Sequence, residues 1–423
     1  MINIEKLLKE SDLISDWKIN GTKTESYELF FVHSKLETVR STDTDALTVT
    51  VYCDHDGKKG QASFKIFAST TEEEAKAKIA DAAKKALIIG NEYYTLPENE
   101  VLDGVIESNF AAYEPRALAA KMAEAVFSAD MLRMGSVNAL EVFINKYTVT
   151  VKNSRGIDKR EVKYSAMIEA IPTWNEGESV ELYEAIRTAE FDFDKIKTEI
   201  EAKMREVRDR GRAKAPECKL SCPVVLPAEE LSQLFSELSY GLNYSSVYTH
   251  SNPFSEGDAI QKAPSGDKIN VTMRGQISGS TASSLFDGDG TTLTDTEVIK
   301  NGMASSYHGG HRFAQYLGKS ATGMLSCVEV GTGTLSDKEL MSAPYFECIS
   351  MSGLQLDIYN DYIGGEVRLA YYFDGEKKIP LTSVSISGKL SDALNSIRLS
   401  DELTQTGRYK GPKLALLKNI EIV

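Results

Sequence analysis

Residues 61–90, QASFKIFASTTEEEAKAKIADAAKKALIIG, change from a strand pattern to a helix pattern within a few positions. Apolar and polar residues partly alternate in the first part, as they do in a strand with one buried face. Thr71 and Glu74 then have the spacing of a capping box, which marks the start of a helix. This helix is expected to stop at Gly90. Four apolar residues at helical spacing predict its buried face: Ala75, Ile79, Ala82 and Ala86.

The same order of elements occurs twice in the first half of the chain. Two strands are predicted ahead of this stretch, at residues 25–40 and 46–54. A second copy has strands at 138–154 and 159–174, followed by a long helix at 191–215. Each helix is expected to cover one face of an antiparallel sheet. The pattern therefore predicts an α+β fold with a duplicated strand-strand-strand-helix unit.

The composition changes at RGRAKAPECKLSCP, residues 210–223, where a basic helix end runs into prolines. We place a domain boundary there, between domains 1–215 and 216–423. The second domain has short alternating segments separated by turn residues, which predicts a mostly antiparallel β domain, barrel or sandwich-like. One helix is predicted in it, at residues 227–242. Four residues form its apolar stripe: Leu231, Leu234, Phe235 and Leu238.

The overall composition excludes several classes of protein. With 423 residues and a formal net charge of -14, the chain is acidic, and phosphate would repel it, so we expect no nucleic-acid surface. No run of about 18 apolar residues predicts a membrane span, and the charged N-terminus lacks the apolar core of a signal peptide. Five scattered cysteines favour reduced thiols. We therefore expect a cytoplasmic protein.

Two histidines in SSYHGGHRF, residues 305–313, raise the question of a metal site. His308 and His311 are three positions apart, but the glycines between them favour a turn, and two ligands hold zinc weakly. The first interpretation is a pair of turn or surface histidines. The alternative is an active metalloenzyme with an unconventional site, in which Cys327 or Asp287 joins both histidines. Asp287 itself lies in FDGDGTT, which is expected to form a hairpin turn.

Four segments in the second half resemble, in their order and spacing, the TldD/PmbA family, once called modulators of DNA gyrase. The most characteristic combines Asp374-Gly375 with an ISG-x-L step at residues 386–390. The resemblance implies a duplicated α+β N-terminal domain followed by a β-rich C-terminal domain. Its segments are CPVVLPAEELSQLFSEL at 222–238, residues 286–323, residues 357–394, and GRYKGPKLALLKNIEI at 407–422.

The resemblance also implies what this chain lacks. TldD-type members are zinc peptidases with an H-E-x-x-x-H pattern on the helix after the P-V-V-L segment and a cysteine near the C-terminus. Here Ser236 and Gly241 stand at the histidine positions and Glu237 at the glutamate position, while Arg408 or Tyr409 lies near the expected cysteine. Neither serine nor glycine replaces imidazole as a zinc ligand. The pattern resembles the PmbA (TldE) branch, which implies no metal, no cofactor and no catalytic residue in this chain.

The function implied by this resemblance is that of a metal-free subunit of a TldD/TldE-type peptidase that clips unfolded or modified peptides. The partner would be a zinc-bearing TldD-like subunit, or a second copy of the chain. Two alternatives remain: an active metallopeptidase with an unconventional site built on His308 and His311, and a homodimeric, non-enzymatic peptide-binding module. Five residues are expected to contact the peptide: Tyr371, Tyr372, Phe373, His308 and His311.

Overall fold

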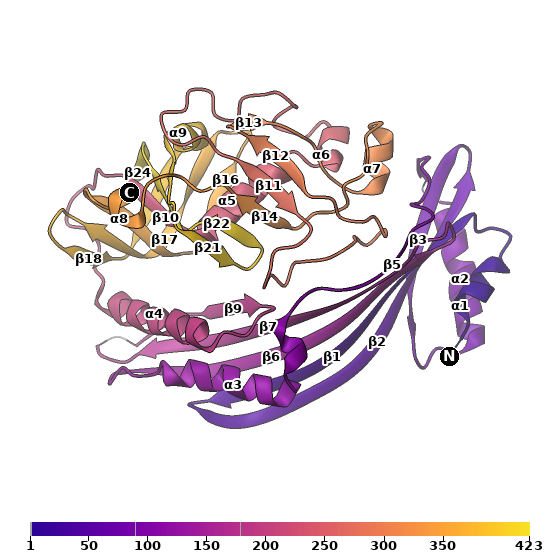
Figure 1. Cartoon of the computed structure of the whole chain (residues 1–423), viewed down its shortest axis with the longest axis horizontal. Helices are drawn as coiled ribbons and strands as arrows, with labels where there is room; N and C mark the ends of the chain where they lie inside the picture. The colour runs from indigo at the N-terminus through magenta and orange to yellow at the C-terminus, as the bar shows by residue number, and fades with distance from the viewer. Residues whose placement is uncertain (1, 89, 178) are drawn as a thin grey trace.

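The computed structural model describes residues 2–88, 90–177 and 179–423. Figure 1 shows a long curved sheet with helices, formed by the first half of the chain, and a β-rich second half that lies over it. The predicted α+β fold class is confirmed. A closed barrel, one of the two forms expected for the second half, is wrong, because its sheets are open. Within the described residues, no helix is long and apolar enough to cross a membrane.

The N-terminal sheet has nine strands in the order β4-β3-β2-β1-β6-β7-β5, with β8 and β9 also paired to β7. Strands β1 and β6 pair antiparallel at its centre, so both copies of the repeated unit share one sheet. Its strands are β1 (Asp16–Val32), β2 (Lys35–His55), β3 (Lys58–Phe67), β4 (Gly90–Glu92), β5 (Val101–Val105), β6 (Gly135–Asn153), β7 (Asp158–Trp174), β8 (Val180–Glu181) and β9 (Glu184–Thr188).

Helices cover one face of this sheet, and the alternation of side chains along β1 shows how. Trp17 and Ile19 pack with α1 and α2, whereas Leu29, on the same face of the strand, packs with α3 and α4. Lys18 and Asn20 point to the opposite face and contact the second half of the chain. The helices are α1 (Ile4–Lys9), α2 (Glu72–Ala86), α3 (Pro115–Ser128) and α4 (Phe193–Arg212).

Two predicted boundaries in the first unit are wrong. The strand expected at 25–40 contains a hairpin turn, because His33 and Ser34 have φ of 47° and 61° and separate β1 from β2. Glycine or asparagine usually occupies such positions, so the sequence carries no turn signal here. The capping box of α2 is confirmed, but the helix ends at Ala86 and Gly90 begins β4.

The second half contains two open sheets. The larger has the order β20-β23-β10-β15-β17-β19-β24, with β16 and β18 paired to β17, and the smaller has the order β13-β12-β11-β14-β22-β21. The larger consists of β10 (Val224–Pro227), β15 (Tyr345–Met351), β16 (Gln355–Asp357), β17 (Tyr362–Phe373), β18 (Lys378–Leu381), β19 (Val384–Lys389), β20 (Arg398–Leu399), β23 (Leu414–Leu417) and β24 (Ile420–Ile422). The smaller consists of β11 (Val271–Arg274), β12 (Thr296–Lys300), β13 (Met303–Ala304), β14 (Cys327–Val330), β21 (Leu403–Thr406) and β22 (Tyr409–Pro412).

The helix α5 (Ala228–Tyr240) lies in the core between these sheets and contacts strands of both. All four residues of its predicted stripe are fully buried, so the expected apolar face is confirmed. Burying such side chains contributes about 1.5–3 kcal/mol each. The remaining helices are α6 (Tyr244–Tyr248), α7 (His311–Tyr316), α8 (Asp337–Leu340) and α9 (Leu390–Ser396).

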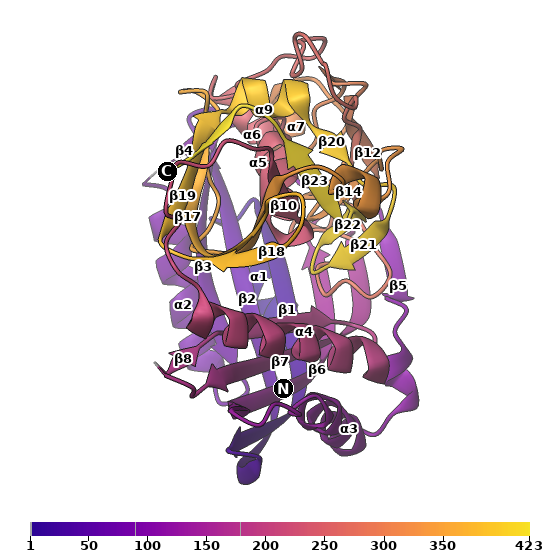
Figure 2. The ribbon, with the colours of Figure 1, turned by 90° about the vertical axis from the view of Figure 1, so that its left-hand side faces the viewer.

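The two halves contact each other at several places, among them the turn in FDGDGTT and the helix α4. At the first, the expected hairpin turn in FDGDGTT is present, closed by pairing of Phe286 with Thr292, and it docks on β1. Lys18 forms an ion pair with Asp289, and the amide of Asn20 donates to the carbonyl of Gly288 at 2.8 Å. At the second, α4 lies between the N-terminal sheet and the strands β17 and β18 (Figure 2). The predicted domain boundary at 215/216 falls between α4 and β10 and stays a prediction.

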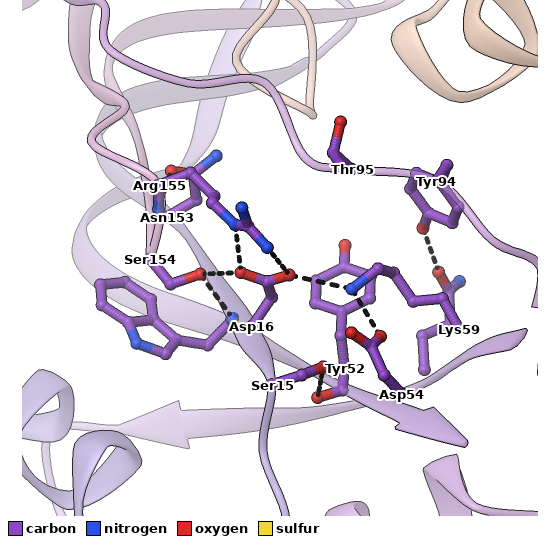
Figure 3. A network of polar contacts seen from close by, with 12 residues as sticks. Ser15, Asp16, Tyr52, Asp54, Lys59, Tyr94, Thr95, Asn153, Ser154 and Arg155 are labelled. Atoms are coloured by element: carbon purple, nitrogen blue, oxygen red, sulfur yellow. Dashed lines mark hydrogen bonds and ion pairs between the residues drawn. The ribbon is translucent and has the colours of Figure 1, made fainter. Parts of the chain in front are cut away.

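A buried ionic network fixes the start of β1 to its neighbours (Figure 3). The ammonium of Lys59, which has no solvent exposure, lies 2.9 Å from Asp16 and 2.7 Å from Asp54. Arg155 donates two hydrogen bonds to Asp16, at 2.7 and 3.1 Å. Burial by itself would raise the pKa of Asp16, but hydrogen bonds from Arg155, Lys59 and Ser154 hold it below its usual value. The network therefore stays ionised and holds β1, β2, β3 and the β6–β7 turn together.

Candidate functional site

The end of α5 carries the three positions where the family resemblance implies a degenerate metal motif. Ser236 is half-buried, Glu237 is exposed in the last turn, and Gly241 is the buried residue that caps the helix. The N–H of Gly241 donates to the carbonyl of Glu237 at 3.2 Å, which satisfies one of the last carbonyls of the helix. The apolar stripe fixes the rotation of α5, and this rotation directs Glu237 away from the core.

A hollow of about 340 Å³ opens beside this helix end, and we call it the α5 hollow. Its walls come from α5, from α6 and the residues after it, and from the end of β16 and the loop that follows. They contain two carboxylates, two phenols and no Lys, Arg or His side chain. The lining residues are Glu237, Tyr240, Gly241, Ser246, Ser251, Pro253, Leu356, Asp357, Ile358 and Tyr359.

The two carboxylates of the α5 hollow have different surroundings. Asp357 accepts hydrogen bonds from the backbone N–H groups of Tyr359 and Asn360, at 3.0 and 2.9 Å, and from the Asn360 amide at 2.6 Å. The Asn360 side chain, followed by the backbone N–H groups, holds the pKa of Asp357 below its usual value. Neither Asp357 nor Glu237 forms an ion pair with any residue in the described part of the chain.

The residues at the end of α5 do not fit a zinc site of the H-E-x-x-x-H type. A Cβ atom at position 241 would lie 2.8 Å from the ring of Pro253, so a histidine there would displace that ring. Tyr409, near the expected third ligand, is fully buried and donates its hydroxyl to Pro412. Across residues 2–88, 90–177 and 179–423, no group of three or more His, Cys, Asp or Glu side chains could hold a metal ion.

The two histidines of SSYHGGHRF lie near each other in the chain but bind different partners. His308 is 3% exposed, and its Nε2 donates to the carbonyl of Ser239 on α5 at 3.0 Å. His311 begins α7 and lies 2.7 Å from the amide nitrogen of Gln315. Burial lowers the pKa of both imidazoles. His308 therefore supports the end of α5, which the turn interpretation did not anticipate.

The alternative metal centre built on these histidines is not assembled in the described structure. Asp287 accepts hydrogen bonds from the backbone of its own turn and from Met324. The thiol of Cys327 is buried and lies 3.7 Å from the hydroxyl of Ser280. Both candidate third ligands therefore have partners other than the histidines.

The three aromatic residues expected to contact a peptide lie at the end of β17, and Figure 1 shows this strand on the opposite side of the second half from α7. Tyr371 donates its hydroxyl to Asp209 of α4 at 2.6 Å, and Tyr372 packs against the main core. Phe373 contacts the ring of Tyr345. Because β15 and β18 pair with both edges of β17 here, a peptide can reach these residues only through their side chains. The structure therefore does not bring the three aromatics and the two histidines together, and their role in peptide binding stays a prediction.

Comparison with known proteins identifies the second half of the chain. Residues 219–423 match the family model described as the PmbA/TldA metallopeptidase C-terminal domain. No protein of curated function matches the chain by sequence. The fold is similar to that of TldE from Thermococcus kodakarensis, with a TM-score of 0.80, 15% identity and 99% of each chain covered.

Two further crystal structures have the same fold. A protein from Bacteroides thetaiotaomicron VPI-5482, described as a putative modulator of DNA gyrase, has a TM-score of 0.78 and 14% identity, and the alignment covers 99% of this chain and 96% of that one. A protein of the same description from Thermotoga maritima MSB8 has a TM-score of 0.76, 13% identity and 96% of each chain covered. At these identities the likeness concerns the fold, which spans both halves of this chain.

Proposed function

This chain belongs to the TldD/PmbA family through residues 219–423, and we propose that it acts in the cytoplasm as a metal-free, TldE-like subunit of a peptidase. In this proposal a zinc-bearing TldD-like subunit supplies the reaction centre. This chain supplies contacts to that partner and part of the surface that binds unfolded or modified peptides. The expected peptide-contacting residues remain Tyr371, Tyr372, Phe373, His308 and His311.

The environment of Gly241 is the observation that carries the proposal. A zinc peptidase needs three protein ligands and an open position for water, and two ligands leave zinc weakly bound. Ser236 and Gly241 offer no imidazole, and Pro253 occupies the space into which a side chain at 241 would extend. Without a metal-bound water, Glu237 has no proton to remove. The residues at this helix end therefore support a subunit that does not perform the hydrolysis itself.

The partner role is supported by main-chain groups that the sheets leave free. Strand β3 pairs with β2 only from Ala46 onward, whereas β1 pairs with β2 along its whole length up to Tyr52. Residues 35–45 of β2 therefore form a sheet edge on the side away from β1, with no neighbour there in the described structure. These residues are exposed except for Thr42. An exposed edge pairs readily with another strand, from a partner or from an extended peptide.

Reconstitution tests this proposal. The chain would be purified alone and with a zinc-bearing homologue from the same genome, and cleavage of an unfolded peptide would be measured for each. We expect a stable complex that cleaves the peptide and no cleavage by this chain alone. Metal-dependent cleavage by the isolated chain would contradict the proposal. If the chain forms a homodimer that binds peptide and forms no complex with any zinc-bearing homologue, the non-enzymatic peptide-binding module becomes the better account of its function.

Two substitutions test the expected peptide surface in the reconstituted pair. Tyr372→Ala and His308→Ala would be compared for folding by circular dichroism, for association with the partner, and for cleavage. Reduced cleavage with folding and association preserved would support a direct contribution of this chain to peptide binding. Unchanged cleavage in both variants would remove these residues from the peptide-binding surface.

A further inference from the structure

We propose that the α5 hollow binds a positively charged group of a peptide, either its α-amine or a Lys or Arg side chain. The inference rests on the proposed function, because it assumes that the ligand of this chain is a peptide. It goes further by naming the chemical class that the site selects. It also gives Glu237 a role that does not require a metal.

The lining of the hollow favours a cation. Glu237 and Asp357 contribute two carboxylates, and no Lys, Arg or His side chain lines the space to neutralise them. Hydrogen bonds from the turn after β16 keep Asp357 ionised, and both carboxylates lack ion-pair partners in the described structure. A charged N–H donor that enters the hollow would find acceptor oxygens there, and charge-assisted hydrogen bonds are stronger than neutral ones.

Two tyrosines at the rim add a second attraction of the same sign. Tyr240 is 60% exposed and Tyr359 is 69% exposed, whereas tyrosine rings in folded proteins are usually more buried than this. Tyr359 donates its hydroxyl to the carbonyl of Ser251, which also lines the hollow, so this hydrogen bond holds the tyrosine at the hollow. The face of an aromatic ring attracts ammonium and guanidinium groups. Rings that flank carboxylates thus suit an alkylammonium or guanidinium group better than a neutral side chain.

The orientation of α5 contributes a third effect. The helix ends at the hollow, and the C-terminal end of a helix carries a partial negative charge. The carbonyls of Glu237, Ser239 and Tyr240 already accept hydrogen bonds from within the chain, so they do not bind the ligand directly. The effect of the helix is therefore a field that adds to the two carboxylates.

The size of the hollow sets the scale of the ligand. A volume of about 340 Å³ lies at the low end of the range for small-molecule sites, so one side chain or one peptide terminus fits and a folded domain does not. The hollow is open to solvent, which allows the rest of the peptide to continue along the surface. Both sources of the cationic group share this chemistry, and the peptides used in the test distinguish them.

Peptide binding to the purified chain, measured by fluorescence anisotropy, tests the inference. Three fluorescent ten-residue peptides would share one sequence: acetylated with a central arginine, acetylated with the neutral isostere citrulline, and citrulline with a free α-amine. We expect the arginine or the free-amine peptide to bind on the order of tenfold more tightly than the neutral peptide. Preference for the arginine peptide identifies the side chain, and preference for the free-amine peptide identifies the terminus. Equal affinities, or no binding of any peptide, would overturn the inference.

Variants locate the preference in the hollow. Glu237→Gln and Asp357→Asn should each remove most of it without changing the affinity for the neutral peptide. Glu73→Gln, on the exposed side of α2, is the matched control and should leave the preference intact. Tyr359→Leu should weaken cation binding on the order of threefold while Tyr359→Phe retains it, because phenylalanine keeps the ring. A preference that survives both carboxylate substitutions would place the cation elsewhere and overturn the inference.

These measurements separate this inference from the proposed function, because they need no partner subunit. Cleavage by a reconstituted pair together with equal affinities for charged and neutral peptides would leave the proposed function standing and remove the inference. A charge preference that depends on Glu237, in a chain that forms no complex with a zinc-bearing homologue, would leave the inference standing and remove the proposed function.

Discussion

The two sides of α5 have opposite characters, one apolar and buried and the other polar and open to solvent. One side carries Leu231, Leu234, Phe235 and Leu238, all fully buried between the two sheets of the second half. The other side, at the last turn, carries Ser236 and Glu237 and ends at Gly241 beside an acidic hollow. Both sides belong to one helix of 13 residues. The buried side therefore holds the helix in place, and the other side supplies the polar groups that line the α5 hollow.

The buried side is set by general rules of packing, and many apolar residues could serve there. The hollow side depends on individual residues, because replacing one changes either the charge of the hollow or the space beside Pro253. Substitutions at the end of the helix can therefore change the chemistry there without loss of the fold. Substitutions on each side should separate the two roles, in stability and in chemistry.

The largest expected effect is on the buried side. Phe235→Ala should lower the free energy of unfolding by about 3–5 kcal/mol, because it removes a fully buried ring and leaves a cavity between two sheets. Chemical denaturation followed by circular dichroism measures this change. Tyr240→Ala is the control on the same helix and should change stability by at most about 0.5 kcal/mol, because its ring is exposed. Equal losses in the free energy of unfolding for the two substitutions would show that the two sides of α5 do not differ in their contribution to stability.

A smaller effect is expected at the end of the helix. Gly241→Ala should cost about 1–3 kcal/mol, because the new methyl group would lie 2.8 Å from the ring of Pro253. The backbone at this position has φ of -60°, so the conformation itself suits alanine. The double variant with Pro253→Ala should therefore recover the loss that the contact causes, in a double-mutant cycle. If Gly241→Ala is neutral or stabilising, the space beside residue 241 is not closed, and the argument against a ligand there fails.

The third effect is on the pH dependence of stability and concerns Glu230, in the first turn of the same helix. Burial, and to a lesser extent Glu229, raises the pKa of its carboxyl to about 7. The folded state therefore keeps this proton to higher pH than the unfolded state, and the free energy of unfolding should fall as pH rises from about 4.5 to 7. Each proton accounts for at most about 1.4 kcal/mol per pH unit.

Glu230→Gln should flatten this part of the pH profile, as measured by thermal unfolding at a series of pH values. Glu73→Gln removes an exposed carboxylate and serves as the matched control. A profile that is as steep in Glu230→Gln as in the wild type would show that this carboxyl does not titrate as its burial predicts.

Much of the fold follows from local patterns in the sequence. The features that could not be predicted are those that no local pattern marks. Thr71 and Glu74 mark the start of α2 because a capping box acts within one turn. The hairpin at His33 and Ser34 could not be predicted, because both residues adopt a left-handed conformation and the pair is not one of the Asn-Gly or Asp-Gly pairs that mark such turns. The docking of Asp289 on Lys18 could not be predicted either, because these residues are far apart in the chain and no local pattern pairs them.

The site was predictable in part. The positions of Ser236, Glu237 and Gly241 followed from the family resemblance, because they lie in one segment. The α5 hollow did not, because its opposite wall comes from β16 and the turn after it, and Asp357 at the end of β16 is indistinguishable in sequence from an ordinary turn carboxylate. The residues expected to contact a peptide are aromatics and histidines within the family-like segments, and the fold places them in two separate regions of the second half.

The metal content of the purified chain tests the central claim most directly. The chain would be dialysed extensively against metal-free buffer, supplied with one equivalent of zinc, dialysed again and analysed by mass spectrometry. The account predicts much less than one zinc per chain, because positions 236 and 241 provide no imidazole and Pro253 closes the space beside Gly241. About one zinc per chain, retained by the wild type after the second dialysis, would contradict it.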